Sequence, residues 1–208
     1  MIAVVNYGIG NLDSVVRALR NCDAEATITS DPEQVERADG IVLPGVGFFS
    51  KAMDHLRESG LLDVLNHRVL DARTPVLGIC LGFQMFSRFS EEGDVDGLGW
   101  IDAETKRFRF DGMDPTPKVP HLGWNDLDHV RESPLFEGIH RDACFYFAHS
   151  YYVSCNDESA VLTRTEYGHD FVSSVQHDNI FGTQFHPEKS HANGVQVIGN
   201  FVRCTRHA

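Results

Sequence analysis

The chain has 208 residues, 42% hydrophobic and 23% charged, with 30 acidic against 18 basic residues and a formal net charge of −12. This composition is typical of a globular protein with one sizeable core, so we expect a single domain over residues 1–208. The negative charge disfavours nucleic acid and anionic membranes as partners. The five cysteines lack the paired spacing of a zinc site or a disulfide scaffold.

No stretch reaches the roughly 20 apolar residues of a membrane-spanning helix. The N-terminus has neither the basic start nor the apolar run of a secretory signal. We therefore expect a cytoplasmic protein. The cysteines and the histidines lack the spacing of metal ligands, and we expect no metal and no organic cofactor.

The first 90 residues alternate strand and helix patterns. Apolar runs predict strands at 2–6, 26–29, 41–43 and 75–79. Helical spacing predicts helices at 12–21, after an Asp31–Pro32 cap, on both sides of Gly60, and at 82–89. Strands that alternate with helices in this way are typical of βαβ units and a mostly parallel sheet.

The second half is richer in short β-type runs, which we expect to form hairpins and late strands of the same sheet. These runs lie at 108–110, 144–148, 151–153, 160–165, 171–175 and 180–184, and helical spacing follows over 194–205. The fold class that this order predicts is a three-layer α/β, flavodoxin-like one. It has a mostly parallel central sheet flanked by helices, with an additional antiparallel β region in the second half.

The segment Gly78–Gly82, with the sequence GICLG, has the pattern of a nucleophile elbow between a strand and a helix, with Cys80 as the nucleophile. The glycines permit a tight turn, and the positive end of the following helix favours the thiolate. The amide of Leu81 is then placed to donate into an oxyanion hole. The alternative is a buried, inert cysteine at a strand end.

A thiolate that attacks an acyl group needs a base, and Phe185–Glu188 supplies a candidate. On an extended backbone His186 and Glu188 point to the same side, and Pro187 disfavours a helix there. Glu188 would orient the imidazole and stabilise its cationic form, as the third member of a triad does.

The segment 43–47, with the sequence LPGVG, is a second junction between a strand and a loop. Its glycines let the backbone approach a ligand, and we expect the second oxyanion donor from Val46 or Gly47. Taken alone, the pattern is equally that of a simple turn. A phosphate loop is disfavoured because neither GxxxxGK[ST] nor GxGxxG occurs.

With these segments in place, the chain resembles the class I, triad-type glutamine amidotransferases, and within them the glutaminase subunits of imidazole glycerol phosphate synthase. The motifs of this resemblance run in order along the chain. They are NYGIGN (6–11), LPGVG (43–47), GICLGFQ (78–84), EEG (91–93), VPHLGWN (119–125), FAHSYY (147–152) and QFHPEKS (184–190). Asn6 departs from the pattern, because many relatives have Asp there.

The resemblance implies that Cys80 attacks the side-chain amide of glutamine, that His186 transfers protons, and that Glu188 orients His186. It implies substrate contacts from Gln84, Glu92, His149, Ser150 and Tyr151. The alternative for Gln84 is a solvated helix residue, and the alternative for Glu92 is a surface charge.

The resemblance also implies a heterodimer with a (β/α)8 synthase subunit that receives the ammonia and makes imidazole glycerol phosphate. A chain of 208 residues is too short to hold a barrel of about 250 as well, so we expect the partner to be a separate chain. Asn11, Trp124 and Lys189 are the interface candidates, with surface or turn residues as the alternative.

Three other functions stay open at this point. One is a triad amidotransferase of another pathway, such as anthranilate, aminodeoxychorismate or pyridoxal phosphate synthesis. The others are a self-sufficient cysteine hydrolase and a degenerate partner-binding domain. The occurrence of PHLGWN together with HSYY disfavours the first, and the intact triad disfavours the last.

Overall fold

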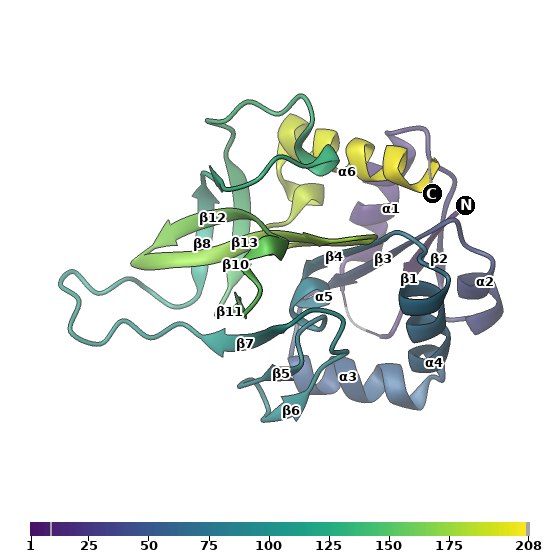
Figure 1. Cartoon of the computed structure of the whole chain (residues 1–208), viewed down its shortest axis with the longest axis horizontal. Helices are drawn as coiled ribbons and strands as arrows, with labels where there is room; N and C mark the ends of the chain where they lie inside the picture. Colours follow the sequence, from purple (N-terminus) through teal and green to yellow (C-terminus); the bar gives the residue numbers. More distant parts are fainter. Residues whose placement is uncertain (9, 207–208) are drawn as a thin grey trace.

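A computed structural model, which describes residues 1–8 and 10–206, has a 12-stranded sheet with helices on both faces (Figure 1). Ile9, inside the 6–11 motif, lies outside the described residues. The strands of the sheet are β1 (Ile2–Val5), β2 (Ala26–Thr29), β3 (Gly40–Gly45), β4 (Val76–Cys80), β5 (Phe89–Ser90), β6 (Val95–Asp96), β7 (Ala103–Arg107), β9 (Asp128–His129), β11 (Tyr151–Cys155), β12 (Val161–Tyr167), β13 (His169–His177) and β14 (Ile180–Thr183).

The strand order along the main path is β2-β1-β3-β4-β14-β13-β11-β7-β5-β6. Neighbours from β2 to β14 are parallel, whereas β13 and β11 pair with their neighbours in antiparallel fashion. The predicted fold class, a mostly parallel sheet between helices with an antiparallel region in the second half, is confirmed.

Helices cover both faces of the parallel half. They are α1 (Leu12–Arg20), α2 (Pro32–Glu36), α3 (Phe49–Glu58), α4 (Leu61–Asn66), the π-turn η1 (His67–Asp71), α5 (Leu81–Gln84) and α6 (His191–Arg206), with short 3-10 turns η2 (Pro134–Phe136), η3 (Glu158–Ala160) and η4 (Pro187–Lys189). Within the described residues, none of these helices is long and apolar enough to cross a bilayer.

Alternate residues of β1 enter two different cores because successive side chains of a strand point to opposite faces. Ile2 and Val4 pack in the core under α1 and α6, whereas Ala3 and Val5 pack in the core under α2, α3 and α4. Figure 1 shows α1 and α6 on one side of the sheet and α3 on the other. The carboxyl ends of the parallel neighbours β3, β4 and β14 meet at one edge of the sheet, where α5 begins directly after β4, and such an edge can carry a site.

Local signals place the helix starts as predicted. Asp31 caps α2, with its Oδ1 atom accepting from the Glu33 amide at 2.9 Å, and Pro32 occupies the first helical position. Gly60 separates α3 from α4 in the left-handed region, with φ of 71°.

The predicted helix over 82–89 is wrong beyond Gln84, where α5 ends. The carbonyl groups of Met85, Phe86 and Ser87 accept from the backbone of 98–101 instead of from helix amides. The Ser87 hydroxyl donates to the Gln84 carbonyl at 2.7 Å, a local bond that competes with helix continuation. The chain is therefore free to form β5.

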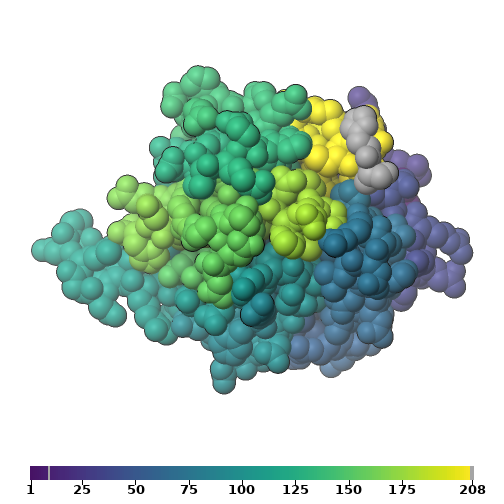
Figure 2. All heavy atoms as spheres, viewed as in Figure 1, coloured from purple at the N-terminus to yellow at the C-terminus, as the bar shows by residue number. Residues whose placement is uncertain are grey.

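Two β predictions also need correction. Residues 144–148 correspond to β10 (Phe145–His149), which pairs with β8 (His121–Asn125) in a separate two-stranded antiparallel sheet rather than in the main one. Residues 108–110 follow β7 instead of forming a strand, and the segment between β7 and β8 projects from one end of the molecule (Figures 1 and 2).

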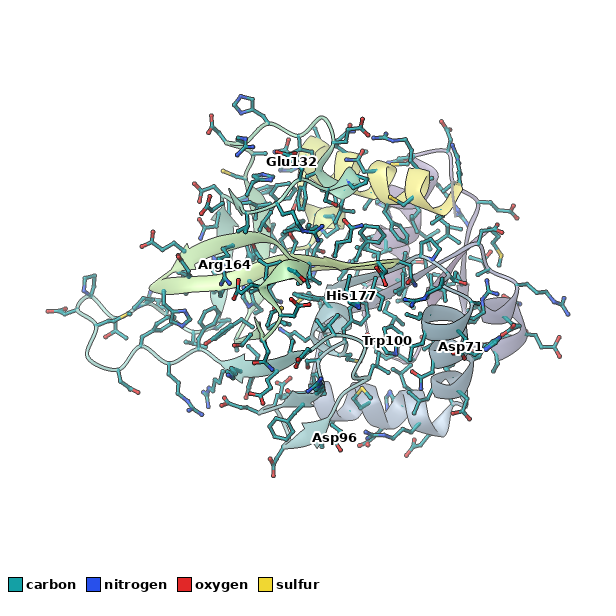
Figure 3. All side chains as sticks on the ribbon, in the orientation of Figure 1. Asp71, Asp96, Trp100, Glu132, Arg164 and His177 are labelled. Atoms are coloured by element: carbon teal, nitrogen blue, oxygen red, sulfur yellow. The ribbon has the colours of Figure 1, made fainter. Side chains whose placement is uncertain are left out.

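The short hairpin of β5 and β6 is held to the helical layer by an aromatic anchor. Trp100, labelled in Figure 3, packs its ring against Phe86 with the centroids 5.1 Å apart. Its indole N–H donates to Asn66 Oδ1 at 2.8 Å, at the end of α4. This contact supports the segment after α5, which carries Glu92.

Candidate active site

A cavity of about 270 Å³ opens where β3 and β4 end. Its walls hold most of the residues that the sequence nominates, together with three others. They are Val46, Gly47, Cys80, Leu81, Gln84, Glu92, Pro120, Leu122, Ala148, His149, Ser150 and Tyr151.

Cys80 has the backbone geometry of a nucleophile elbow. It ends β4 with φ of 53° and ψ of −106°, a conformation that costs a non-glycine residue of order 1–3 kcal/mol. A Cβ atom on Gly82 would lie 1.7 Å from the Leu43 carbonyl oxygen, and one on Gly78 would lie 2.7 Å from the Phe83 backbone. The two glycines are therefore required for β4 and α5 to pack this closely around Cys80.

The 43–47 segment lies directly beside the elbow, because Gly45 is the partner of Cys80 in the β3–β4 register. Val46, Gly47 and Leu81 all line the cavity, as the oxyanion prediction requires. The buried Tyr7 hydroxyl donates to the Pro44 carbonyl and so attaches this segment to the end of β1.

His186 and Glu188 form a buried pair in the turn after β14. His186 Nδ1 lies 2.8 Å from Glu188 Oε1, and their side chains are 1% and 4% exposed. The His186 amide donates to the Tyr146 carbonyl, and Ser190 Oγ donates to the His186 carbonyl. These bonds fix the backbone of the turn that carries the imidazole, and the bond to Glu188 orients the ring.

His186 Nε2 is buried and has no hydrogen-bond partner among the described residues. Burial lowers the pKa of His186, but the charge of the nearby Cys80 sulfur and the hydrogen-bonded Glu188 carboxylate together raise the pKa above its ordinary value. An unpartnered ring nitrogen beside a sulfur is the arrangement expected of a proton-transfer group.

We expect His186 to titrate at a lower pH when Cys80 is replaced by serine, because the sulfur charge is the strongest influence that raises its pKa. NMR titration of the imidazole protons measures this. Cys144→Ser, which changes an exposed thiol, is the matched control and should leave the His186 titration unchanged. An identical His186 titration in wild-type and Cys80→Ser protein would contradict an influence of the Cys80 sulfur on the pKa of His186.

Gln84 and Tyr151 form one wall of the cavity. Gln84 Nε2 donates to the Tyr151 carbonyl at 2.8 Å, so the amide oxygen of Gln84 is left for a ligand. Glu92 Oε2 accepts from the Phe49 amide at 2.9 Å, and burial raises the pKa of Glu92. Glu92 thus lines the cavity and joins its wall to the start of α3.

His149 lies in this wall as a neutral ring. Its Nδ1 is 2.8 Å from the Tyr151 carbonyl, which can only accept, so Nδ1 holds the proton. Its Nε2 therefore accepts from His121 Nδ1 at 3.1 Å. Burial lowers the pKa of His149 to about 3 and that of His121 to about 4. The two rings together support the 149–151 segment, and neither ring carries a charge at neutral pH.

The three interface candidates lie at different places. Trp124 is 48% exposed and stacks on His191, with ring centroids 4.9 Å apart. Lys189 Nζ lies over the Tyr146 ring, 5.9 Å from its centroid, and Trp124 packs against the same ring, which lies beside His186. Asn11 is exposed at the start of α1, where its side chain makes no capping bond.

Besides the three unpredicted residues of the cavity lining, sequence reasoning missed four residues around this site. Tyr7, His121 and Tyr146 support its walls, and Gln184 contacts Cys80 directly, with Nε2 at 3.6 Å from Cys80 Sγ. The signal for Gln184 was its position directly after β14, two residues before His186 in the 184–190 motif.

Comparison with known proteins supports the resemblance to class I glutamine amidotransferases. The family model of class I glutamine amidotransferases matches residues 3–204. A chain from Pseudomonas aeruginosa named imidazole glycerol phosphate synthase subunit HisH 2 is 47% identical over 97% of this chain and 98% of that relative. A protein of the same name from Methanococcus maripaludis is 43% identical over 98% and 99%.

The chain belongs to the class I glutamine amidotransferases, in the branch of the HisH subunits.

The predicted resemblance is thus confirmed, as is the prediction that this amidotransferase chain is an enzyme. The solved structure of a glutamine amidotransferase has the same fold. Its TM-score is 0.76 at 20% identity, over 99% of this chain and 98% of that one. Among the described residues, no group of three or more His, Cys, Asp or Glu side chains is arranged to hold a metal ion.

Proposed function

We propose that the chain hydrolyses L-glutamine to glutamate and ammonia through a thioester on Cys80. The ammonia passes to a separate (β/α)8 synthase subunit, which makes imidazole glycerol phosphate and aminoimidazole carboxamide ribotide in histidine biosynthesis. The observation that carries the proposal is the elbow cysteine in a cavity, beside a buried His186–Glu188 pair.

In this mechanism the Cys80 thiolate attacks the side-chain amide carbon of glutamine. The oxyanion that forms is stabilised by the Leu81 amide and by donors of the Val46–Gly47 segment. His186 gives a proton from Nε2 to the departing ammonia, and then takes one from the water that hydrolyses the thioester. Glu188 Oε1, at 2.8 Å from His186 Nδ1, keeps Nδ1 protonated throughout.

The substrate is oriented by the cavity wall. The amide oxygen of Gln84 and the carboxylate of Glu92 are acceptors suited to the α-ammonium group of glutamine. The Ser150 and Tyr151 backbone lines the same cavity, and His149 keeps it rigid through the Tyr151 carbonyl. Each of these roles is part of the proposal.

The proposed partner docks over the mouth of this cavity. Leu122 lines the cavity and is 65% exposed, and Val46, Phe48 and Trp124 are also exposed large apolar side chains. An apolar rim with Trp124 and Lys189 is suited to a protein interface, because aromatic side chains are enriched there. Asn11 extends the proposed contact to the start of α1.

We further propose that residues 1–208 act as one amidotransferase domain, supported by a family model that spans residues 3–204 and by one continuous main sheet. All five cysteines are free, which fits the reducing cytoplasm as the compartment.

Glutaminase assays with and without the purified barrel subunit test this function. We expect low glutamine hydrolysis by the chain alone, and a large rise when the barrel subunit is present together with its nucleotide ligand. The isolated barrel subunit and the chain with an unrelated barrel protein are the controls. Full activity without the partner, or stimulation by the synthase component of another amidotransferase pathway instead, would contradict the proposal.

A further inference from the structure

Gln184 is the one buried amide in contact with the proposed nucleophile among the described residues. Its side chain is fully buried, and its Nε2 lies 3.6 Å from Cys80 Sγ. Its own backbone amide donates to the Ser173 carbonyl at 2.8 Å, which anchors it to β13. Burying a polar group costs free energy unless the group is hydrogen-bonded, so the hydrogen bonds of this amide compensate for its burial.

The direction in which this amide points follows from its neighbours. The Tyr151 carbonyl can only accept, so the NH2 group of Gln84 must face it, at 2.8 Å. The same NH2 group then reaches Gln184 Oε1 at 3.1 Å. Gln184 therefore accepts on its oxygen, and its NH2 group is left for the sulfur.

This orientation is reinforced from a second side. The Tyr151 carbonyl also accepts from His149 Nδ1, at 2.8 Å, so this carbonyl is held by two donors. These hydrogen bonds form a relay from the Tyr151 carbonyl through Gln84 and Gln184 to Cys80. Each side-chain amide can make its bonds in only one of its two orientations, which differ by exchange of the oxygen and the NH2 group. A single backbone carbonyl thus decides which atom faces the sulfur.

We propose that Gln184 is a catalytic residue whose amide N–H stabilises the thiolate of Cys80, and that Gln84 is a positioning residue that keeps this N–H aimed at the sulfur. The inference rests on the proposed function, in which Cys80 is the nucleophile. A hydrogen bond to a charged acceptor is stronger than one to a neutral acceptor, so the bond favours the thiolate over the thiol.

The test is the pH dependence of Cys80 alkylation by iodoacetamide in the purified full chain, followed on the Cys80 peptide by mass spectrometry. Gln184→Leu should raise the midpoint of this profile by about one pH unit, the order expected for one lost bond to a charged group. Gln184→Met, which keeps an unbranched chain of similar length, is the second variant and should shift the midpoint in the same direction. Gln196→Leu, a glutamine on α6, is the matched control and should leave it unchanged.

Two further readouts separate this role from a structural one. In the complex with the barrel subunit, Gln184→Leu should lower kcat about tenfold while KM stays within about twofold, because Gln184 acts on the sulfur rather than on bound glutamine. Gln84→Leu should also raise the alkylation midpoint, and the double variant should shift it no further than Gln184→Leu alone.

An unchanged midpoint in folded Gln184→Leu and Gln184→Met proteins would overturn the inference. Additive shifts in the double variant would overturn the relay through Gln84. Failure of the proposed function is visible separately: a glutamine-like diazo ketone would then fail to label Cys80 in the wild-type complex. Labelling with an unchanged midpoint removes only the role of Gln184.

Discussion

Cys80→Ala will reduce ammonia release from glutamine by roughly 10³-fold or more in the complex with the barrel subunit, because the variant has no nucleophile to form the acyl-enzyme. The loss will appear in kcat. Cys80 is only 5% exposed at the base of the cavity, so its sulfur adds nothing to a docking surface, and the variant should still form the complex. Steady-state glutaminase kinetics and size-exclusion chromatography measure the two outcomes.

The matched control is Cys144→Ala, which removes an exposed free thiol outside the cavity lining. It should retain wild-type activity and complex formation. Ammonia release by Cys80→Ala at more than a few per cent of the wild-type rate would mean that another group is the nucleophile.

Gly82→Ala will destabilise the chain by about 3 kcal/mol or more, or prevent folding, because its Cβ atom would lie 1.7 Å from the Leu43 carbonyl oxygen. That oxygen belongs to the backbone of β3, so no side-chain rotation relieves the clash. Protein that still folds should lose most of its glutaminase activity, since α5 must move away from β3 and take the Leu81 amide with it. Urea unfolding and glutaminase kinetics measure both effects.

The control for this substitution is Gly199→Ala in α6. A Cβ atom there would lie 3.5 Å from Cys22, which is an ordinary contact distance. The substitution therefore removes the unfavourable helix propensity of glycine without creating a clash. It should stabilise the chain by roughly 0.5–1 kcal/mol. Equal stability of Gly82→Ala and wild-type protein would show that β3 and α5 are not packed as described.

The βαβ half of the fold was predictable because its signals are local. The apolar runs of β1, β3 and β4 are short and continuous, the Asp31–Pro32 cap marks a helix start, and Gly60 marks a break. The end of α5 was not predictable, since it depends on carbonyl groups of 85–87 that bond to residues 98–101, a contact visible only in three dimensions. The separate β8–β10 sheet is likewise a matter of pairing between distant segments.

The proposed triad was accessible from the sequence because each member lies in a short motif whose geometry follows from a strand end, a glycine or a proline. The geometry now brings Cys80, His186 and Glu188 together. Gln184 and Tyr7 were not singled out, although each lies just after a strand and inside a motif, because a motif does not show which atoms its side chains contact. Their roles depend on which atom faces Cys80 Sγ or the Pro44 carbonyl.

The most direct test of the central proposal is to capture the intermediate. The complex with the barrel subunit is mixed with glutamine, quenched in acid within its turnover time, digested, and analysed by mass spectrometry. We predict that the peptide containing Cys80 gains one glutamyl group, and that this gain is absent in Cys80→Ala. Ammonia release without a glutamyl adduct on any peptide, or an adduct on a residue other than Cys80, would contradict the mechanism.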